Sequence, residues 1–251
     1  MDNHQKKMVT AELDTAMIFA AGLGTRLKPW TDRYPKALAP VNGKPLLQRN
    51  IEYLKSFGIN NVVINVHHFA DQVIEFLEKN NNFGCAIKVS HEKEEALETG
   101  GGLKYAEPLL QNAKRLLIIN ADILTDLNIA AMLQYHLAHN PLATLAVTDR
   151  SSSRYFLFNE KYQLCGWQNN KTGEERIAVL SSLNIPMAFS GIHIIEQSIF
   201  PLITEIGKFS MVDLYLRLCK EYPIVGYDHS NDILVDVGKP ESIAIAEKYF
   251  L

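Results

Sequence analysis

A glycine-rich segment near the start of the chain has the composition of a phosphate-binding loop. It reads Ala20-Ala21-Gly22-Leu23-Gly24-Thr25-Arg26-Leu27 and directly follows a short apolar run. Glycines let backbone N–H groups approach phosphate oxygens closely, and the Arg26 guanidinium adds a fixed cationic fork. Leu27 stands where the third glycine of a dinucleotide-binding G-x-G-x-x-G motif belongs, and the spacing also differs from that of the P-loop. The segment therefore predicts a triphosphate cradle and argues against a dinucleotide-dependent oxidoreductase.

A lysine follows in a loop that two prolines restrict. Lys36 lies between Pro35 and Pro40, and this is how a loop holds a point charge at a set position. We expect the Lys36 ammonium to face the α-phosphate of a nucleotide. Lys28 and Lys44 lie nearby in the chain, and we interpret them as solvated surface residues.

Two aspartates end distant strand-like runs. Asp122 follows the buried run 115–120, and Asp236 ends the run 233–236. Ligands of open α/β sheets gather at the carboxyl ends of strands, so a site is expected at Asp122 on topology alone. Magnesium takes one or two carboxylates together with substrate phosphates, and two strand-end aspartates suit it.

Together these segments resemble the signature of the sugar-phosphate nucleotidyltransferases. The pattern continues from the first loop as Pro35-Lys36-x-Leu38-x-Pro40-Val41-x-Gly43-Lys44-Pro45-Leu46, and the match is looser in the second half of the chain. The resemblance implies that the first loop binds the triphosphate, that Lys36 contacts the phosphates at the reacting centre, and that Asp122 and Asp236 hold Mg²⁺. Ala121 departs from the pattern, since relatives commonly carry glycine there. The catalytic residues implied are Lys36, Arg26 and Asp122, and the first set of nucleotide-binding residues is Ala20, Ala21, Gly22, Gly24, Thr25, Arg26 and Lys36.

A second match is the segment Leu97-Glu98-Thr99-Gly100-Gly101-Gly102-Leu103. Its glycines would let the backbone lie against a flat ligand. In relatives this stretch meets the nucleobase and ribose, which adds Glu98, Thr99, Gly100 and Gly101 to the nucleotide-binding residues. The sequence of this segment resembles that of N-acetylmuramate-1-phosphate uridylyltransferases and of short mannose-1-phosphate guanylyltransferase-like proteins.

The sugar-binding residues that we expect are Asn120, Ser190 and Gly191. Ser190, Gly191 and nearby His193 lie in a segment that resembles the sugar-facing strand of the family, and Gly191 would leave room for a hexose. The Glu-Lys-Pro triplet that helps to bind sugar in many relatives is absent, and Glu174, Glu175 and Arg176 lie in roughly that region. The sugar and the base therefore stay open. Four further histidines have metal-like spacing without acidic neighbours, and we interpret them as structural or surface residues: His67, His68, His136 and His139.

An alternation of strand and helix patterns must position these residues. The first half predicts strands at 15–20, 61–66, 86–90 and 115–120, with helices at 46–57, at 71–79 with Asp71 as N-cap, and at 128–139. The second half predicts strands at 142–148, 155–158, 163–167, 187–195, 224–227 and 233–236, some of them antiparallel, with helices at 196–205, 211–220 and 240–250.

These elements predict one α/β domain over residues 1–251, with a Rossmann-like, GT-A-like nucleotidyltransferase fold. We expect a mixed, mainly parallel sheet with helices on both faces and a β-rich sugar-binding insertion. The nucleotide-binding half spans about 13–140, and the strand-rich, sugar-binding half spans about 141–251. A chain of 251 residues with 47% hydrophobic and 21% charged residues is ordinary for a globular protein and long enough to bury a core.

Charge and hydropathy exclude several classes of protein. A net charge of -3, from 25 basic and 28 acidic residues, lacks the basic surplus that nucleic-acid binding requires. No window reaches the roughly 18 apolar residues of a membrane span, and no signal-peptide run follows residues 1–10. The three cysteines, Cys85, Cys165 and Cys219, are odd in number and far apart, which fits reduced structural thiols. We expect a cytoplasmic monomer or small homo-oligomer without a nucleic-acid or membrane partner.

The resemblance implies a magnesium-dependent enzyme that condenses a sugar 1-phosphate with a nucleoside triphosphate and releases pyrophosphate. The pair that we expect is UTP with N-acetylmuramate 1-phosphate or a related hexose 1-phosphate. Three alternatives share the loop, the lysine and the aspartates: a GTP:mannose-1-phosphate guanylyltransferase, a CTP:phosphocholine-type cytidylyltransferase, and a non-catalytic paralogue that binds a nucleotide-sugar and regulates a partner.

Overall fold

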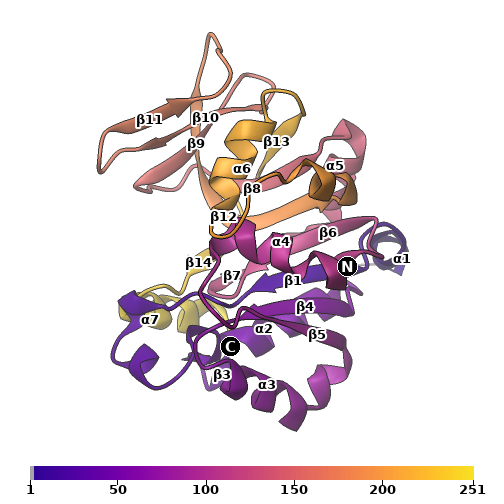
Figure 1. The fold of residues 1–251 in the computed structure, drawn as a ribbon, viewed down its shortest axis with the longest axis vertical. Helices are drawn as coiled ribbons and strands as arrows, with labels where there is room; N and C mark the ends of the chain where they lie inside the picture. The colour runs from indigo at the N-terminus through magenta and orange to yellow at the C-terminus, as the bar shows by residue number, and fades with distance from the viewer. Residues whose placement is uncertain (1–2) are drawn as a thin grey trace.

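A ten-stranded sheet runs through the molecule, and helices pack on both of its faces (Figure 1). The structure is a computed structural model that describes residues 3–251. The strands of the large sheet are β1 (Thr15–Phe19), β4 (Asn61–Val66), β5 (Ala86–His91), β6 (Arg115–Asn120), β8 (Ala143–Thr148), β9 (Arg154–Phe158), β10 (Leu164–Asn169), β11 (Glu174–Ile177), β12 (Ile185–Glu196) and β13 (Ile224–Asp228). Two small sheets pair β2 (Pro40–Val41) with β3 (Lys44–Pro45) and β7 (Ile123–Thr125) with β14 (Leu234–Asp236). The helices are α1 (Asn3–Glu12), α2 (Leu46–Ser56), α3 (Ala70–Lys79), α4 (Glu98–Leu110), α5 (Ile129–His139), α6 (Met211–Leu218) and α7 (Pro240–Tyr249).

The order of strands divides the sheet into two halves. Strands β6, β1, β4 and β5 are neighbours in that order and all parallel, as expected for β-α-β units. The long strand β12 joins this half to the rest, because it pairs antiparallel with β6, β8 and β9. Beyond β9 the sheet continues antiparallel through β10 to β11, which forms the upper arm in Figure 1. The mixed α/β architecture with a strand-rich second half is therefore confirmed.

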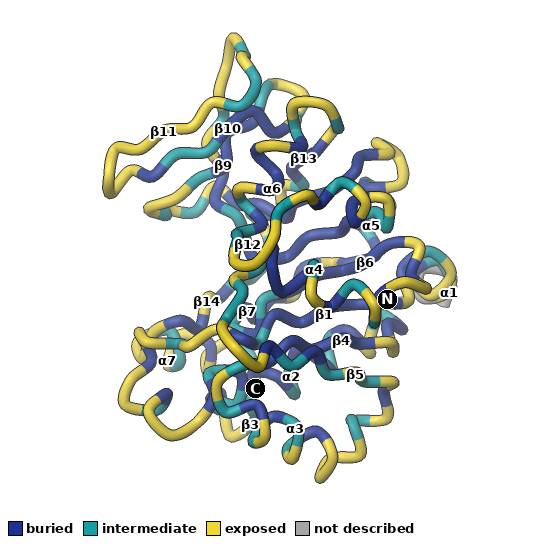
Figure 2. The backbone as a smooth tube through the Cα atoms, in the orientation of Figure 1, coloured by how far each residue is buried: buried dark blue, intermediate teal, exposed yellow. Residues whose placement is uncertain are grey.

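Alternation along the central strands explains why both faces are covered. In β6, Leu117 and Ile119 belong to one core cluster, whereas Leu116 and Ile118 belong to the other. The first cluster receives apolar residues of α1, α2, α3 and α5, and the second receives those of α4 and α6. In a third, smaller cluster Leu27 and Leu46 pack with apolar residues of α7 and of the β7–β14 pair. Figure 2 shows the central strands buried and the β11 arm exposed.

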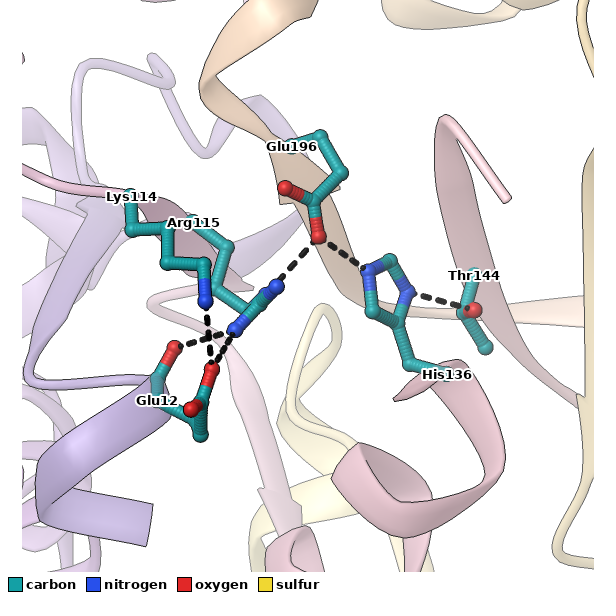
Figure 3. A network of polar contacts seen from close by, with 6 residues as sticks. All are labelled: Glu12, Lys114, Arg115, His136, Thr144 and Glu196. Atoms are coloured by element: carbon teal, nitrogen blue, oxygen red, sulfur yellow. Dashed lines mark hydrogen bonds and ion pairs between the residues drawn. The ribbon is translucent and has the colours of Figure 1, made fainter. Parts of the chain in front are cut away.

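The N-terminal helix α1 is joined to the sheet by a network of polar contacts (Figure 3). Arg115, whose side chain is only 7% exposed, pairs with the Glu12 carboxylate at the end of α1 and, at 2.8 Å, with Glu196 Oε1 at the end of β12. His136 Nε2 lies 2.9 Å from the same Glu196 oxygen, and His136 Nδ1 lies 2.8 Å from Thr144 Oγ1. Burial alone would raise the pKa of Glu196, but the hydrogen bonds from His136 and Arg115 outweigh burial and lower it.

Some elements differ from the expectation. The helix predicted at 196–205 is instead a 3₁₀ turn over Gln197–Leu202, and Pro201 within it lacks the N–H that a longer helix would need. Asp71 is not an N-cap, because α3 begins at Ala70 behind Phe69, which has a φ of 57°. Helix α1 and the short strands β7 and β11 were not predicted at all. Helix α1 and strand β11 carry few apolar residues in a regular period, and β7 has only three residues, too few to show one.

A buried histidine makes the stability of the fold depend on pH. His193 on β12 is 1% exposed and lies among Phe19, Phe189 and Tyr215, and burial lowers its pKa to about 3. In the unfolded chain its pKa is about 6.5, so the unfolded state binds the proton more readily. The contribution of His193 to the free energy of unfolding is therefore fully present above about pH 6.5, and between pH 6.5 and pH 3 it falls by about 1.4 kcal/mol for each pH unit.

Denaturant unfolding at about pH 7.5 and about pH 5.5 measures this effect. We expect His193→Gln to reduce the difference in unfolding free energy between the two conditions by about 1.4 kcal/mol. His229, with a pKa lowered to about 4 chiefly by burial, contributes in the same direction and remains in the variant. An unchanged pH dependence in the variant would contradict the role of His193.

None of the helices formed by residues 3–251 combines the length and the apolar character needed to traverse a lipid bilayer.

Candidate active site

The carboxyl ends of β1, β4 and β6 meet at one edge of the sheet, and a cavity of about 190 Å³ opens there. Backbone and side-chain hydrogen bonds fix this edge. Ala121 N donates to Phe19 O at 3.0 Å, and Ala20 N donates to Asn65 Oδ1 at 2.7 Å. The residues that line the cavity are Phe19, Ala20, Gly22, Lys36, Ala37, Thr99, Asn120, Ala121 and Asp122. The structure thus brings together residues from four separate segments that the sequence singled out.

The glycine-rich loop turns sharply at Gly24, which has a φ of 62°. Its carbonyl accepts from Leu27 N at 2.8 Å and from Thr31 Oγ1 at 3.0 Å, and a 3₁₀ turn over Thr25–Leu27 follows. A Cβ at Gly24 would lie 2.8 Å from Lys36 Cβ. Glycine is therefore required at this position so that the lysine loop can pack directly against the glycine-rich loop.

Lys36 is held in place by its backbone and by an ion pair. It opens a 3₁₀ turn over Lys36–Leu38 behind Pro35, whose φ is -65°. Its ammonium pairs with the Asp122 carboxylate, and the two side chains are only 14% and 19% exposed. By contrast, Lys28 is 61% exposed and pairs with Asp32 of its own loop. Lys36 is thus a partly desolvated cation at the end of β6, where its electrostatic effect is larger than at the open surface.

Asp236 is brought to the same edge by the small β7–β14 sheet. It lies opposite Ile123 in that pair, and Val237 N donates to Asp122 O at 2.8 Å. A Cβ at Gly238 would lie 2.6 Å from Asp236 Oδ1 and 2.7 Å from Arg26 Nη2, so the carboxylate and the guanidinium flank this glycine. Lys36 thus forms an ion pair with Asp122, whereas Arg26 and Asp236 both lie next to Gly238.

The chemistry of this edge fits magnesium. Its donor set is carboxylate oxygen, which a hard cation prefers. Within residues 3–251 no group of three or more His, Cys, Asp or Glu side chains could hold a metal ion. A metal bound by Asp122 and Asp236 would therefore need further oxygen ligands, and substrate phosphates or water supply these for Mg²⁺.

The second glycine segment forms the first turns of α4. Glu98 has a φ of 61° and is half exposed, and Thr99 Oγ1 accepts from Met211 N at 3.0 Å. Gly100 N and Gly101 N both donate to Phe209 O, at 2.9 and 3.1 Å. A Cβ on Gly100 would lie 2.4 Å from the Phe209 ring. The first two glycines thus let segment 207–209 pack on α4. Of residues 97–103, Thr99 lines the cavity.

The three expected sugar residues lie close together on β6 and β12. Gly191 has a φ of 75°, and a Cβ there would lie 2.6 Å from Asn120 Nδ2. Ser190 is fully buried, and its hydroxyl lies 2.7 Å from His229 Nε2. Glu174, Glu175 and Arg176 lie apart from this cluster on the exposed strand β11, and Arg176 pairs with Asp213 of α6.

Sequence reasoning missed two polar residues at this edge, Asn65 and Glu92. Both are 2% exposed and lie at the ends of β4 and β5, next to the glycine-rich loop and to α4. A signal was present, since Asn65 interrupts the apolar run 62–66 and Glu92 directly follows β5. Polar residues at the carboxyl ends of neighbouring parallel strands reach the same edge of the sheet.

The chain is similar in sequence to a family model and to several known proteins. The family model described as nucleotidyl transferase matches residues 15–156. An N-acetylmuramate alpha-1-phosphate uridylyltransferase of Caulobacter vibrioides is 46% identical over 97 residues, which cover 38% of this chain and 40% of that protein. Mannose-1-phosphate guanyltransferase beta-B of Xenopus laevis is 30% identical over 218 residues, which cover 79% of this chain and 58% of that protein. The chain thus spans about half the length of these relatives.

Solved structures share the fold at lower sequence identity. UDP-glucose pyrophosphorylase in complex with UDP-glucose has a TM-score of 0.79 and 18% identity, covering 95% of this chain and 98% of that one. HddC from Yersinia pseudotuberculosis in complex with GMP-PN has a TM-score of 0.76 and 22% identity, covering 94% of this chain and 99% of that one.

Proposed function

Because the chain belongs to the nucleotidyl transferase family, we propose that it joins a sugar 1-phosphate to a nucleoside triphosphate and releases pyrophosphate. The observation that carries this proposal is the partly buried pair of Lys36 and Asp122 beside the glycine-rich loop. The pair places a cation and a carboxylate at one cavity, as transfer of a phosphate-linked group requires. Residues 1–251 act as one domain, whose first half binds the nucleotide and whose second half binds the sugar.

The reaction is an in-line displacement at the α-phosphorus of the nucleotide. An oxygen of the sugar phosphate forms a new bond to that phosphorus, the bond to the β-phosphate bridging oxygen breaks, and pyrophosphate leaves with the electron pair. A sugar phosphate is already ionised near neutral pH, so no strong general base is needed. Lys36 and Arg26 orient the phosphates and neutralise the charge that spreads over them.

Asp122 and Asp236 would hold Mg²⁺, which neutralises phosphate charge when it is bound. Ala20, Ala21, Gly22, Gly24 and Thr25 form the loop that receives the triphosphate, and Thr99, with Glu98, Gly100 and Gly101 around it, lies toward the nucleoside. Asn120, Ser190 and Gly191 form the sugar side. The first of these lines the cavity, and Gly191 leaves room beside the Asn120 amide.

For the substrates we propose UTP and N-acetylmuramate 1-phosphate or a related hexose 1-phosphate. Support comes from the uridylyltransferase of Caulobacter vibrioides, which shares the higher identity in an alignment of 97 residues. The second candidate is GTP with mannose 1-phosphate, which the longer alignment with the Xenopus laevis guanyltransferase favours.

A substrate panel tests the proposal. Pyrophosphate release would be measured with Mg²⁺ for UTP, GTP, CTP and dTTP, each against N-acetylmuramate 1-phosphate, mannose 1-phosphate, glucose 1-phosphate, N-acetylglucosamine 1-phosphate and phosphocholine. We expect turnover with UTP and N-acetylmuramate 1-phosphate, and loss of it on removal of Mg²⁺ with a chelator. Turnover with GTP and mannose 1-phosphate instead would select the second candidate. Nucleotide binding without turnover of any pair would contradict the enzymatic assignment.

A further inference from the structure

We propose that Asn65 and Glu92 are positioning residues that fix the glycine-rich loop relative to the start of α4, and that nucleotide affinity depends on this buried pair. The inference rests on the proposed function, because it concerns the nucleotide site described above. Neither side chain lines the cavity, so each would act through the backbone that it holds.

Asn65 holds the first residue of the glycine-rich loop. Its Oδ1 accepts from Ala20 N at 2.7 Å, and its Nδ2 donates to Glu92 Oε1 at 2.7 Å. The orientation of the amide is unambiguous, since an N–H group faces one end and a carboxylate faces the other. Ala20 is itself at the cavity. Asn65, the penultimate residue of β4, thus determines where the phosphate-binding loop leaves β1.

Glu92 holds the backbone at the start of α4. Its Oε2 accepts from Leu97 N at 2.8 Å, directly before Glu98 and Thr99. One carboxylate oxygen therefore accepts a hydrogen bond from Asn65, and the other accepts one from Leu97. It is 2% exposed, and a buried carboxylate is retained in proteins where hydrogen bonds satisfy it.

The third glycine of the segment is explained by the same pair. A Cβ on Gly102 would lie 2.7 Å from Glu92 Oε1 and 2.8 Å from Asn65 Nδ2. Helix α4 therefore approaches the hydrogen bond between the two side chains so closely that only glycine fits. Three hydrogen bonds in series, Ala20 to Asn65, Asn65 to Glu92 and Leu97 to Glu92, connect the two loops between which a nucleotide would bind.

An exchange of the two functional groups tests the inference. Asn65→Asp alone places two carboxylates against each other, and Glu92→Gln alone leaves an amide NH₂ facing another donor. The double variant restores all three hydrogen bonds: the carboxylate at position 65 accepts from Ala20 N and from the new amide, whose oxygen accepts from Leu97 N. The summed charge of the pair is also unchanged.

The readouts are the dissociation constants of UTP and GTP by titration calorimetry, the KM and kcat of the active pair, and the melting temperature. We expect each single variant to raise the nucleotide Kd and KM by about tenfold or more, with kcat changed less than about threefold. The double variant should return within about threefold of the wild type. Gly102→Ala places a methyl group of α4 against the Asn65–Glu92 pair and should also raise the nucleotide Kd. It tests the inference by itself if a single variant at position 65 or 92 does not fold.

The matched control is the amide–carboxylate pair of Gln48 and Glu52 on α2, 2.8 Å apart and away from the cavity. Glu52→Gln should leave the nucleotide Kd unchanged. A lower melting temperature without any change in Kd or KM would reduce Asn65 and Glu92 to structural residues and overturn the inference. Nucleotide binding without turnover would overturn the proposed function alone, and a wild-type chain that binds neither nucleotide would overturn both.

Discussion

Replacing Lys36 by alanine should lower kcat for pyrophosphate release by about a hundredfold or more. Loss of a cation at a reacting phosphate removes about 3 kcal/mol of transition-state stabilisation. Lys36 is suited to this role because its side chain is 14% exposed and its neighbours hold its backbone. Its charge is therefore partly shielded from water and held in a fixed position. The measurement is steady-state kinetics with the active substrate pair at saturating Mg²⁺.

The control for this prediction is Lys79→Ala. Lys79 also forms an ion pair, with Glu75 at 2.7 Å, but its side chain is 71% exposed on α3. Removal of such a surface cation should leave kcat unchanged. If Lys36→Ala turned over at nearly the wild-type rate while folded, the phosphate-binding role of Lys36 would be wrong. The calorimetric titration of nucleotide into the same variant shows whether binding or chemistry is lost.

Replacing Arg115 by methionine should lower the free energy of unfolding by about 3 kcal/mol or more. The guanidinium links Glu12 of α1 with Glu196 of β12, and its removal leaves Glu12 with Lys114 and Glu196 with His136 (Figure 3). The loss is large because the side chain is 7% exposed and its partners lose a desolvated cation. Denaturant unfolding monitored by circular dichroism gives the value.

Lys114 provides a matched control for Arg115. It is the preceding residue and pairs with the same Glu12 carboxylate at 2.9 Å, but its side chain is 65% exposed. Lys114→Met should therefore cost less than about 1 kcal/mol. Arg115 lies at the opposite end of β6 from Asn120, about 17 Å away along the strand, so kcat of the folded Arg115→Met protein should match the wild type. Equal losses of stability in the two variants would contradict the role of burial.

The parallel half of the fold could be predicted because its signals are local. Short apolar runs define β1, β4 and β6, and the sheet then brings their ends together without further information. Lys36 and Asp122 are 86 residues apart in sequence, yet each was identified from its own segment. Their catalytic roles stay predictions.

Other features depend on contacts that no single segment encodes. Glycines 100 and 101 face Phe209 and Gly207, more than 100 residues away, so the segment alone could not predict their packing role. Helix α1 has few apolar residues, and its position depends on Val9 in the core and on Glu12 at Arg115. The contact between Asn65 and Glu92 becomes evident only when the strand order places β4 between β1 and β5.

The outer strand β11 ends the large sheet and is exposed along its whole length. Such a strand leaves one row of backbone donors and acceptors unpaired, which another molecule could extend into a continuous intermolecular sheet. Here the strand has four residues, and three of them in succession carry charge: Glu174, Glu175 and Arg176. A short charged edge disfavours this kind of aggregation, so neutral, β-branched residues at these positions would lower the solubility of the protein before they altered its stability.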